Sequence, residues 1–184
     1  MKKVLLLGDS IREGYEPYVR ELLTEEADVM APGKNGRFAK YTLWGVNLWL
    51  KELGSPCVDV VHWNNGLWDV HREAPMTEPL TSIEEYVHTL DRIADELART
   101  GARIIFATTT PVRADAVGRT NGEIDQYNEA AARLMKERGI ALNDLNGALR
   151  PRLNEYVCED RLHLTDAGSR RCAERVAAAV REQL

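Results

Sequence analysis

The chain has 184 residues, of which 44% are hydrophobic and 29% are charged, and its formal net charge is −5. This length and composition predict one soluble globular domain over residues 1–184. The acidic balance argues against a nucleic-acid partner, because binding to phosphates needs a basic face. The lysines and arginines are scattered, so an anionic membrane surface is not favoured either. We therefore expect a small-molecule ligand or substrate.

Neither membrane insertion nor secretion is indicated. No apolar run approaches the ~18 residues of a membrane-spanning helix. The basic start followed by Val4–Leu7 mimics a signal peptide, but its apolar part is too short. We therefore expect a cytoplasmic protein. Cys57, Cys158 and Cys172 lack Cys-x-x-Cys spacing, which favours reduced, buried thiols over a structural zinc site.

The first part of the chain alternates short apolar segments with helical patterns. Its predicted elements are a strand at 4–7, a helix with Pro17 in its first turn, a strand at 27–31, a helix at 41–53 that Gly54-Ser55-Pro56 ends, and a strand at 57–63. Polar turns follow the strands, namely Gly8-Asp9-Ser10, Lys34–Arg37 and Asn64–Asp69.

The alternation continues to the end of the chain. The predicted elements are a helix from the cap Ser82 to Gly101, a strand at 102–108, a helix from the cap Thr120 to Gly139, a strand at 140–144, an irregular helical connection at 145–156, and a helix from the cap Thr165 to Leu184. Five such alternations predict an α/β fold: a doubly wound α/β/α sandwich on a five-stranded parallel sheet of order 2-1-3-4-5.

Ser10 is the first candidate for chemistry, because it follows the first strand at the edge where such sheets bind ligands. Gly-Asp-Ser by itself is also an ordinary turn. A serine nucleophile needs an imidazole base, and the imidazole needs an acceptor on its far nitrogen. Asp160-x-x-His163 in a tight turn can place a carboxylate against Nδ1 while Nε2 faces the nucleophile. By itself, this pair is equally consistent with two surface residues that have no catalytic role.

Taken together, these motifs resemble those of the SGNH (GDSL-type) hydrolases, which are serine esterases on a flavodoxin-like α/β/α fold. Gly8-Asp9-Ser10 matches the first block of that family, and Gly36 matches the glycine of the second. Asp160–Leu164 matches the last block. The resemblance implies that Ser10 is the nucleophile, that His163 is its base and that Asp160 orients the base. It also implies that the backbone N–H groups of Ser10 and Gly36 bind the oxyanion.

The third block departs from the family pattern. The family carries Gly-x-Asn-Asp, whose Asn donates to the oxyanion, whereas this chain has Gly66-Leu67-Trp68-Asp69. The indole N–H of Trp68 is one replacement. Asn64 or Asn65 is another, and a pocket without this donor is the third. We favour Trp68 or Asn65 and expect Asp69 to order the loop.

Other side chains are candidates for the walls of the site. Arg12, Arg113 and Asn64 are interpreted as substrate-binding. His71 follows the third-block loop, and a place beside the pocket is the less favoured alternative for it. His62 and His88 are expected to be packed or on the surface. The four tryptophans are candidates for a sugar-stacking platform, although Trp49 and Trp63 fit the core better.

The predicted activity is serine-dependent ester hydrolysis without a metal or organic cofactor. We expect a small-molecule ester substrate, with a small acyl group such as acetyl on a carbohydrate or other polar alcohol. A lysophospholipase or thioesterase of the same family is the alternative enzyme. A non-catalytic binding domain that keeps the pocket is the alternative of another class. The sequence does not predict the oligomeric state.

Overall fold

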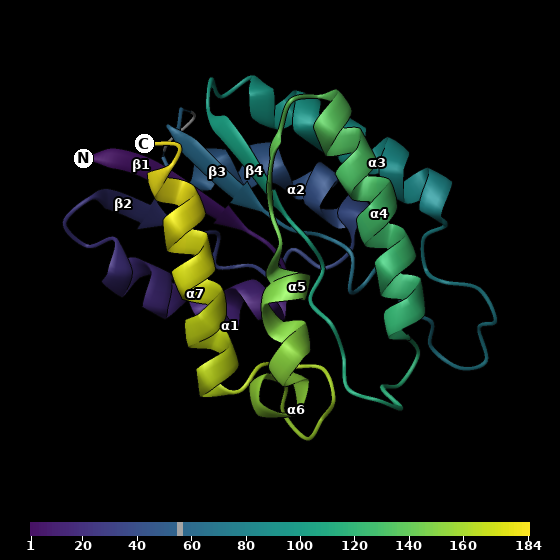
Figure 1. Cartoon of the computed structure of the whole chain (residues 1–184). Helices are drawn as coiled ribbons and strands as arrows, with labels where there is room; N and C mark the ends of the chain where they lie inside the picture. The colour runs from purple at the N-terminus through teal and green to yellow at the C-terminus, as the bar shows by residue number, and fades with distance from the viewer. Residues whose placement is uncertain (55–56) are drawn as a thin grey trace.

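A computed structural model of the chain describes residues 1–54 and 57–184, and it places five strands in one sheet with helices on both sides (Figure 1). The strands are β1 (Lys2–Leu7), β2 (Ala27–Met30), β3 (Val60–Trp63), β4 (Arg103–Ala107) and β5 (Ala141–Asn143). All neighbouring strands are parallel, and their order is β2-β1-β3-β4-β5. The predicted fold class and strand order are therefore confirmed. The predicted helix break at Ser55 and Pro56 lies outside the described residues.

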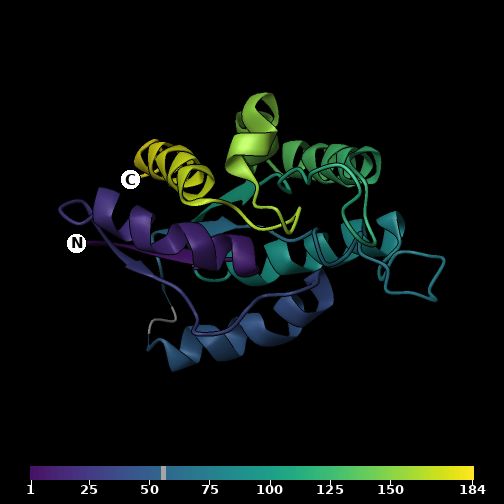
Figure 2. The same ribbon diagram turned by 90° about the horizontal axis from the view of Figure 1, so that it is seen from below.

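The helices form two layers that cover the sheet. They are α1 (Ser10–Leu22), α2 (Ala39–Glu52), α3 (Ile83–Ala98), α4 (Asn121–Glu137), α5 (Leu145–Leu149), α6 (Leu153–Tyr156) and α7 (Asp166–Arg181), with a 3₁₀ turn η1 (Arg150–Arg152) between α5 and α6. Helix α1 packs against α7, while α2 packs against α3. Figure 2 shows α7 and α2 on opposite sides of the sheet. Within the described ranges, no helix is both long and apolar enough to cross a lipid bilayer.

The register aligns the carboxyl ends of the central strands. Leu7 of β1 lies beside Trp63 of β3, and Trp63 lies beside Phe106 of β4. Because these strands are parallel, the residues that follow them leave the sheet at the same edge. The turn after Leu7 and the loop after Trp63 therefore lie next to each other, and the Asn64 N–H donates to the Leu7 carbonyl at 3.0 Å.

Two local features keep the turn between β1 and α1 short. A Cβ on Gly8 would lie only 2.8 Å from Arg12 Cβ, so glycine lets the helix start close to the strand. Asp9 caps the helix, since its Oδ1 accepts from the Ile11 N–H at 2.9 Å. Ser10 is then the first helical residue. The prediction that Pro17 lies in the first turn is wrong, because Pro17 lies inside α1.

Most of the other predicted boundaries differ from the observed ones by a few residues. The capping box of Thr120 and Glu123 is present at the start of α4. At α3, Ser82 accepts from the Glu85 N–H, but the Glu85 carboxylate pairs with Lys40 instead of closing the box. Trp49 and Trp63 are buried in the core as expected. Cys172 is also buried, whereas Cys57 is exposed, contrary to the prediction.

His62 is a buried, neutral residue of β3. Its side chain is 0% exposed, and its Nε2 lies 3.1 Å from the amide nitrogen of Asn143. That nitrogen only donates, so Nε2 accepts and the ring proton sits on Nδ1, 3.5 Å from the Tyr15 hydroxyl oxygen. Burial lowers the pKa of His62 from 6.5 to about 3. The core therefore favours the uncharged ring.

We expect His62 to make the folded chain less stable in acid. Below pH 6.5 the unfolded chain binds a proton at this residue, while the folded chain does so only near pH 3. The free energy of unfolding therefore falls as the pH drops, by about 2 kcal/mol between about pH 7.5 and about pH 5. Urea denaturation of the wild type and of His62→Phe at both pH values measures this term. An equal pH dependence in the two proteins would rule it out.

Candidate active site

A cavity of about 370 Å³ opens at the carboxyl end of the sheet. Its walls come from the first turn of α1, from the loops after β3 and β4, and from the loop before α7. The lining residues are Asp9, Ser10, Leu67, Trp68, His71, Glu73, Ala116, Val117, Arg119, Asp160, Leu162 and His163. Segments that are up to 154 positions apart in the sequence, from Asp9 to His163, thus meet at one site.

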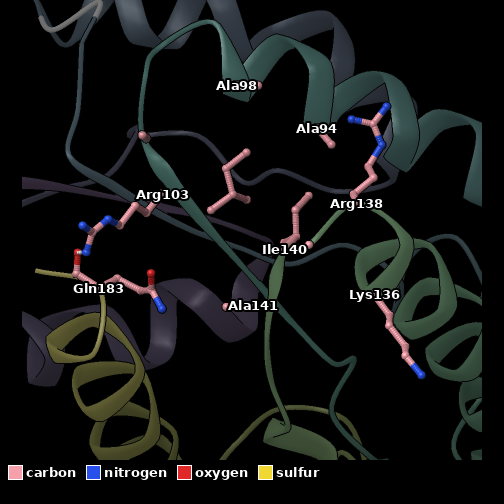
Figure 3. Close-up of a pocket in the computed structure, with 11 residues that line it drawn as sticks. Ala94, Ala98, Arg103, Lys136, Arg138, Ile140, Ala141 and Gln183 are labelled. Carbon is pink, nitrogen blue, oxygen red and sulfur yellow. Dashed lines mark hydrogen bonds between the residues drawn. The ribbon is translucent and has the colours of Figure 1, made fainter.

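A larger hollow of about 720 Å³ lies at the opposite end of the sheet, where β4 and β5 begin (Figure 3). Its arginines are engaged with the protein itself. Arg103 donates to the Gln183 carbonyl, and Arg138 pairs with Asp91 and Asp95. Arg103 thus has a carbonyl partner and Arg138 has two carboxylate partners, whereas Ser10 and His163 line the smaller cavity.

Ser10, His163 and Asp160 form a continuous hydrogen-bonded chain at the mouth of this cavity. Ser10 Oγ lies 2.9 Å from His163 Nε2, and His163 Nδ1 lies 2.7 Å from Asp160 Oδ2. The side chains of His163 and Asp160 are about half exposed. The three residues predicted from separate motifs are thus brought together in the order that proton transfer from a serine requires.

Hydrogen bonds fix the loop before α7, and this loop orients the His163 ring. Asp160 Oδ1 accepts from the backbone N–H groups of Leu162 and His163. The Cys158 N–H donates to the His163 carbonyl at 2.7 Å. Thr165 caps α7 directly behind this turn. Asp160 therefore fixes both the backbone and the ring of the residue that it orients.

Ionised Asp160 is favoured by its surroundings. Partial burial raises the pKa of Asp160, but the Leu162 N–H, the His163 ring and the His163 N–H together lower it below its ordinary value. A carboxylate in this position accepts the Nδ1 proton, so the neutral ring presents a free acceptor at Nε2. That acceptor faces Ser10 Oγ.

The oxyanion donors differ from those expected. Ser10 is the first residue of α1, where N–H groups have no intrahelical partner and the helix dipole favours an anion. The Gly36 N–H, however, donates its one hydrogen to the Gly8 carbonyl at 2.8 Å. The prediction that Gly36 is an oxyanion donor is therefore wrong for this structure. Gly36 instead allows close approach, since a Cβ there would lie 2.7 Å from the Gly8 oxygen.

Asn65 is also unavailable, which corrects a second prediction. Its side chain is 0% exposed, and its amide donates to the Arg37 carbonyl and to Thr42 Oγ1. Its oxygen accepts from Trp63 Nε1 at 2.7 Å. Every hydrogen of this amide is used within the protein. Trp68, by contrast, lines the cavity and is 38% exposed, so its indole is the third-block side chain in the cavity wall that carries a hydrogen-bond donor.

Asp69 orders the loop, as predicted. Both of its carboxylate oxygens accept from the Ala39 N–H at the start of α2, and its carbonyl accepts from the Thr81 N–H. Burial raises the pKa of Asp69 to about 7, although the Ala39 N–H opposes this shift. Asp69 thus ties the loop after β3 to α2.

The three predicted substrate-binding residues do not line the cavity. Arg12 is 3% exposed and binds Glu16 and the carbonyls of Pro32 and Lys34, so it fastens the loop after β2. The amide of Asn64 donates to the Ala107 carbonyl. The backbone N–H of Arg113 donates to the Arg161 carbonyl, and the Arg113 side chain is not part of the cavity wall. Contacts within the protein therefore correct the predictions for Arg12 and Asn64, and the position of Arg113 outside the lining corrects the third.

Sequence reasoning missed three polar residues of the cavity. Asp9, Glu73 and Arg119 line it, and so does His71, whose place beside the pocket was only the less favoured alternative from the sequence. Asp9 directly precedes Ser10 in the Gly-Asp-Ser turn, and that position was a usable signal. Arg119 lies in the loop after β4, where no motif marks it.

The fold and this geometry define the class of protein: an α/β/α hydrolase whose serine, histidine and aspartate meet at the carboxyl edge of a parallel sheet. The chain belongs to the GDSL-like Lipase/Acylhydrolase family, whose model matches residues 6–171. It is therefore a hydrolase of the carboxylic ester class.

The chain is also similar to individual proteins. The chain is 24% identical to the GDSL esterase/lipase WDL1 of Oryza sativa subsp. japonica, over 97% of this chain and 77% of that protein. The lipase/acylhydrolase from Enterococcus faecalis superimposes with a TM-score of 0.85 at 19% identity, covering 100% of this chain and 97% of that one. The acetylxylan esterase Axe2 from Geobacillus stearothermophilus superimposes with a TM-score of 0.82 at 21% identity, covering 97% and 94%. These structures share the fold.

Proposed function

We propose that the protein hydrolyses esters of small acyl groups, in particular acetyl, on a polar alcohol such as a carbohydrate, and that Ser10 forms the acyl-enzyme. The observation that carries this proposal is the hydrogen-bonded chain from Ser10 through His163 to Asp160 at the mouth of the cavity. The cavity of about 370 Å³ suits a small substrate. The acetylxylan esterases among the structural relatives support the acetyl group.

The reaction runs in two steps. His163 Nε2 takes the proton of Ser10 Oγ while the oxygen attacks the ester carbonyl, and the Ser10 N–H with Trp68 Nε1–H binds the oxyanion. The tetrahedral intermediate expels the alcohol, which receives the proton from His163. Water then gives a proton to His163 and attacks the acyl-enzyme, and the carboxylic acid leaves as Ser10 recovers its proton. Asp160 stabilises the charged imidazole during both steps.

Hydrolysis of p-nitrophenyl esters from acetate to octanoate tests the acyl group. We expect kcat/KM to be highest for acetate, because a cavity of about 370 Å³ with Asp9, Glu73 and Arg119 in its wall suits a short acyl group better than an octanoyl chain. The same panel on Trp68→Phe tests the oxyanion donor, since this change keeps the ring and removes the N–H. It should lower kcat by about 10²-fold. A preference for octanoate would overturn the acetyl assignment, and an unchanged kcat in Trp68→Phe would remove that residue from the oxyanion hole.

A further inference from the structure

Three polar atoms in the cavity wall are buried without a hydrogen-bond partner in the described part of the chain. They are Asp9 Oδ2, His71 Nδ1 and Arg119 Nε. Asp9 is only 1% exposed, and its other oxygen already caps α1. A buried polar atom without a partner costs free energy, and such atoms in a ligand cavity are the ones that a bound molecule can satisfy. The reaction of Ser10 and His163 uses none of these three atoms.

The backbone around Arg119 is fixed at the cavity wall. The preceding Gly118 has a φ of 71°, and its carbonyl accepts from the Arg72 N–H at 2.9 Å. A Cβ at Gly118 would lie 2.2 Å from the Arg72 carbonyl oxygen and 2.5 Å from His71 Nδ1. The following Thr120 caps α4. The loops after β3 and β4 are thus clamped together with Gly118 against His71, and Arg119 and His71 both line the cavity.

The charges around Arg119 indicate what kind of group it receives. Burial lowers the pKa of Arg119, while the carboxylates of Asp9 and Glu73 oppose that shift. Burial raises the pKa of Asp9, so this carboxyl adds less negative charge than an exposed one. Glu73 and Asp160 also line the cavity, against the single guanidinium of Arg119. A negatively charged substrate would meet more carboxylates than cations and would be repelled. A neutral group that both accepts and donates hydrogen bonds fits this wall better.

We propose that Arg119, together with Asp9 Oδ2 and His71 Nδ1, forms a subsite that binds the hydroxyl groups of a neutral polyhydroxy alcohol. Arg119 donates to a hydroxyl oxygen, and Asp9 accepts from a hydroxyl hydrogen of the same alcohol. An acetyl group carries no hydroxyl, so these contacts go to the alcohol part of the ester. This inference rests on the proposed function and deepens it, since it assigns the residue that selects the alcohol.

The test compares three acetate esters that differ only in the alcohol: glycerol monoacetate, ethyl acetate and O-acetyl lactate. The enzyme variants are Arg119→Met, which keeps an apolar stem of similar length, and Arg113→Met as a matched control outside the cavity. We expect the wild type to prefer glycerol monoacetate over ethyl acetate. Arg119→Met should reduce that ratio of kcat/KM about tenfold or more, mainly through KM, because a hydrogen bond from a charged donor is lost. Arg113→Met should leave the ratio unchanged.

Three other results overturn the inference in distinguishable ways. If Arg119→Met lowers kcat/KM equally for glycerol monoacetate and ethyl acetate, the residue does not select the alcohol, although the proposed function stands. If the wild type prefers O-acetyl lactate and loses that preference in Arg119→Met, the subsite binds an anion. If the wild type hydrolyses none of the three esters, the proposed function fails together with the subsite.

Discussion

Replacing Ser10 by alanine should lower kcat by about 10⁴–10⁶ and leave KM nearly unchanged. The change removes the oxygen that attacks the carbonyl and leaves the walls of the cavity in place. The Ser10 side chain contributes one contact, to His163 Nε2, whereas Asp9 caps the helix that begins here. Steady-state kinetics on p-nitrophenyl acetate measure the loss, and a thermal melt should show that Ser10→Ala is folded.

The double variant Ser10→Ala/His163→Ala is the control for this assignment. Groups that act as one unit are not additive, so the second change should reduce kcat little further. A fluorophosphonate probe gives an independent reading, because it should label the wild type and not Ser10→Ala. If Ser10→Ala keeps the activity of the wild type, the nucleophile is elsewhere. If the wild-type protein is inactive and unlabelled, the non-catalytic binder is the better interpretation.

Local signals explain why so much of the fold could be predicted. The buried strand Val4–Leu7, the capping box at Thr120 and the cap Thr165 depend on residues close together in sequence. The misplaced start of α1 shows the limit of this reasoning. Pro17 fits a first turn well, but Asp9 caps the chain earlier, and the apolar side of α1 is then Ile11, Tyr15 and Val19. The preference of proline for the first turn of a helix was therefore overridden by the earlier cap at Asp9, which is an equally local signal.

The oxyanion and binding residues were harder to predict because their contacts are long-range. Gly36 reaches Gly8 across the ends of two strands, and Asn65 is saturated by Arg37 and Thr42. A motif names a residue type and a spacing, but it does not say which hydrogens the fold has already used. Ser10, Asp160 and His163 could be predicted, because their chemistry requires that these three side chains form hydrogen bonds with each other.

Asp160→Asn should lower kcat by about 10³–10⁴, and the structure gives the reason. Asp160 Oδ1 accepts from two backbone N–H groups, while Oδ2 faces His163 Nδ1. The amide oxygen of the substituted side chain would keep the two backbone bonds, so its NH₂ group would point at Nδ1. Two donors cannot face each other, and the ring would move its proton to Nε2. A ring with Nε2–H cannot take the proton of Ser10.

Asp166→Asn is the matched control for this change. Asp166 lies six positions further along, in the first turn of α7, and binds Tyr18 and Arg170 outside the cavity. Its replacement should leave kcat close to the wild-type value. KM should change little in either variant, because neither carboxylate holds the substrate. If Asp160→Asn retains more than about a tenth of the wild-type kcat, the tautomer of His163 is set by something other than Asp160.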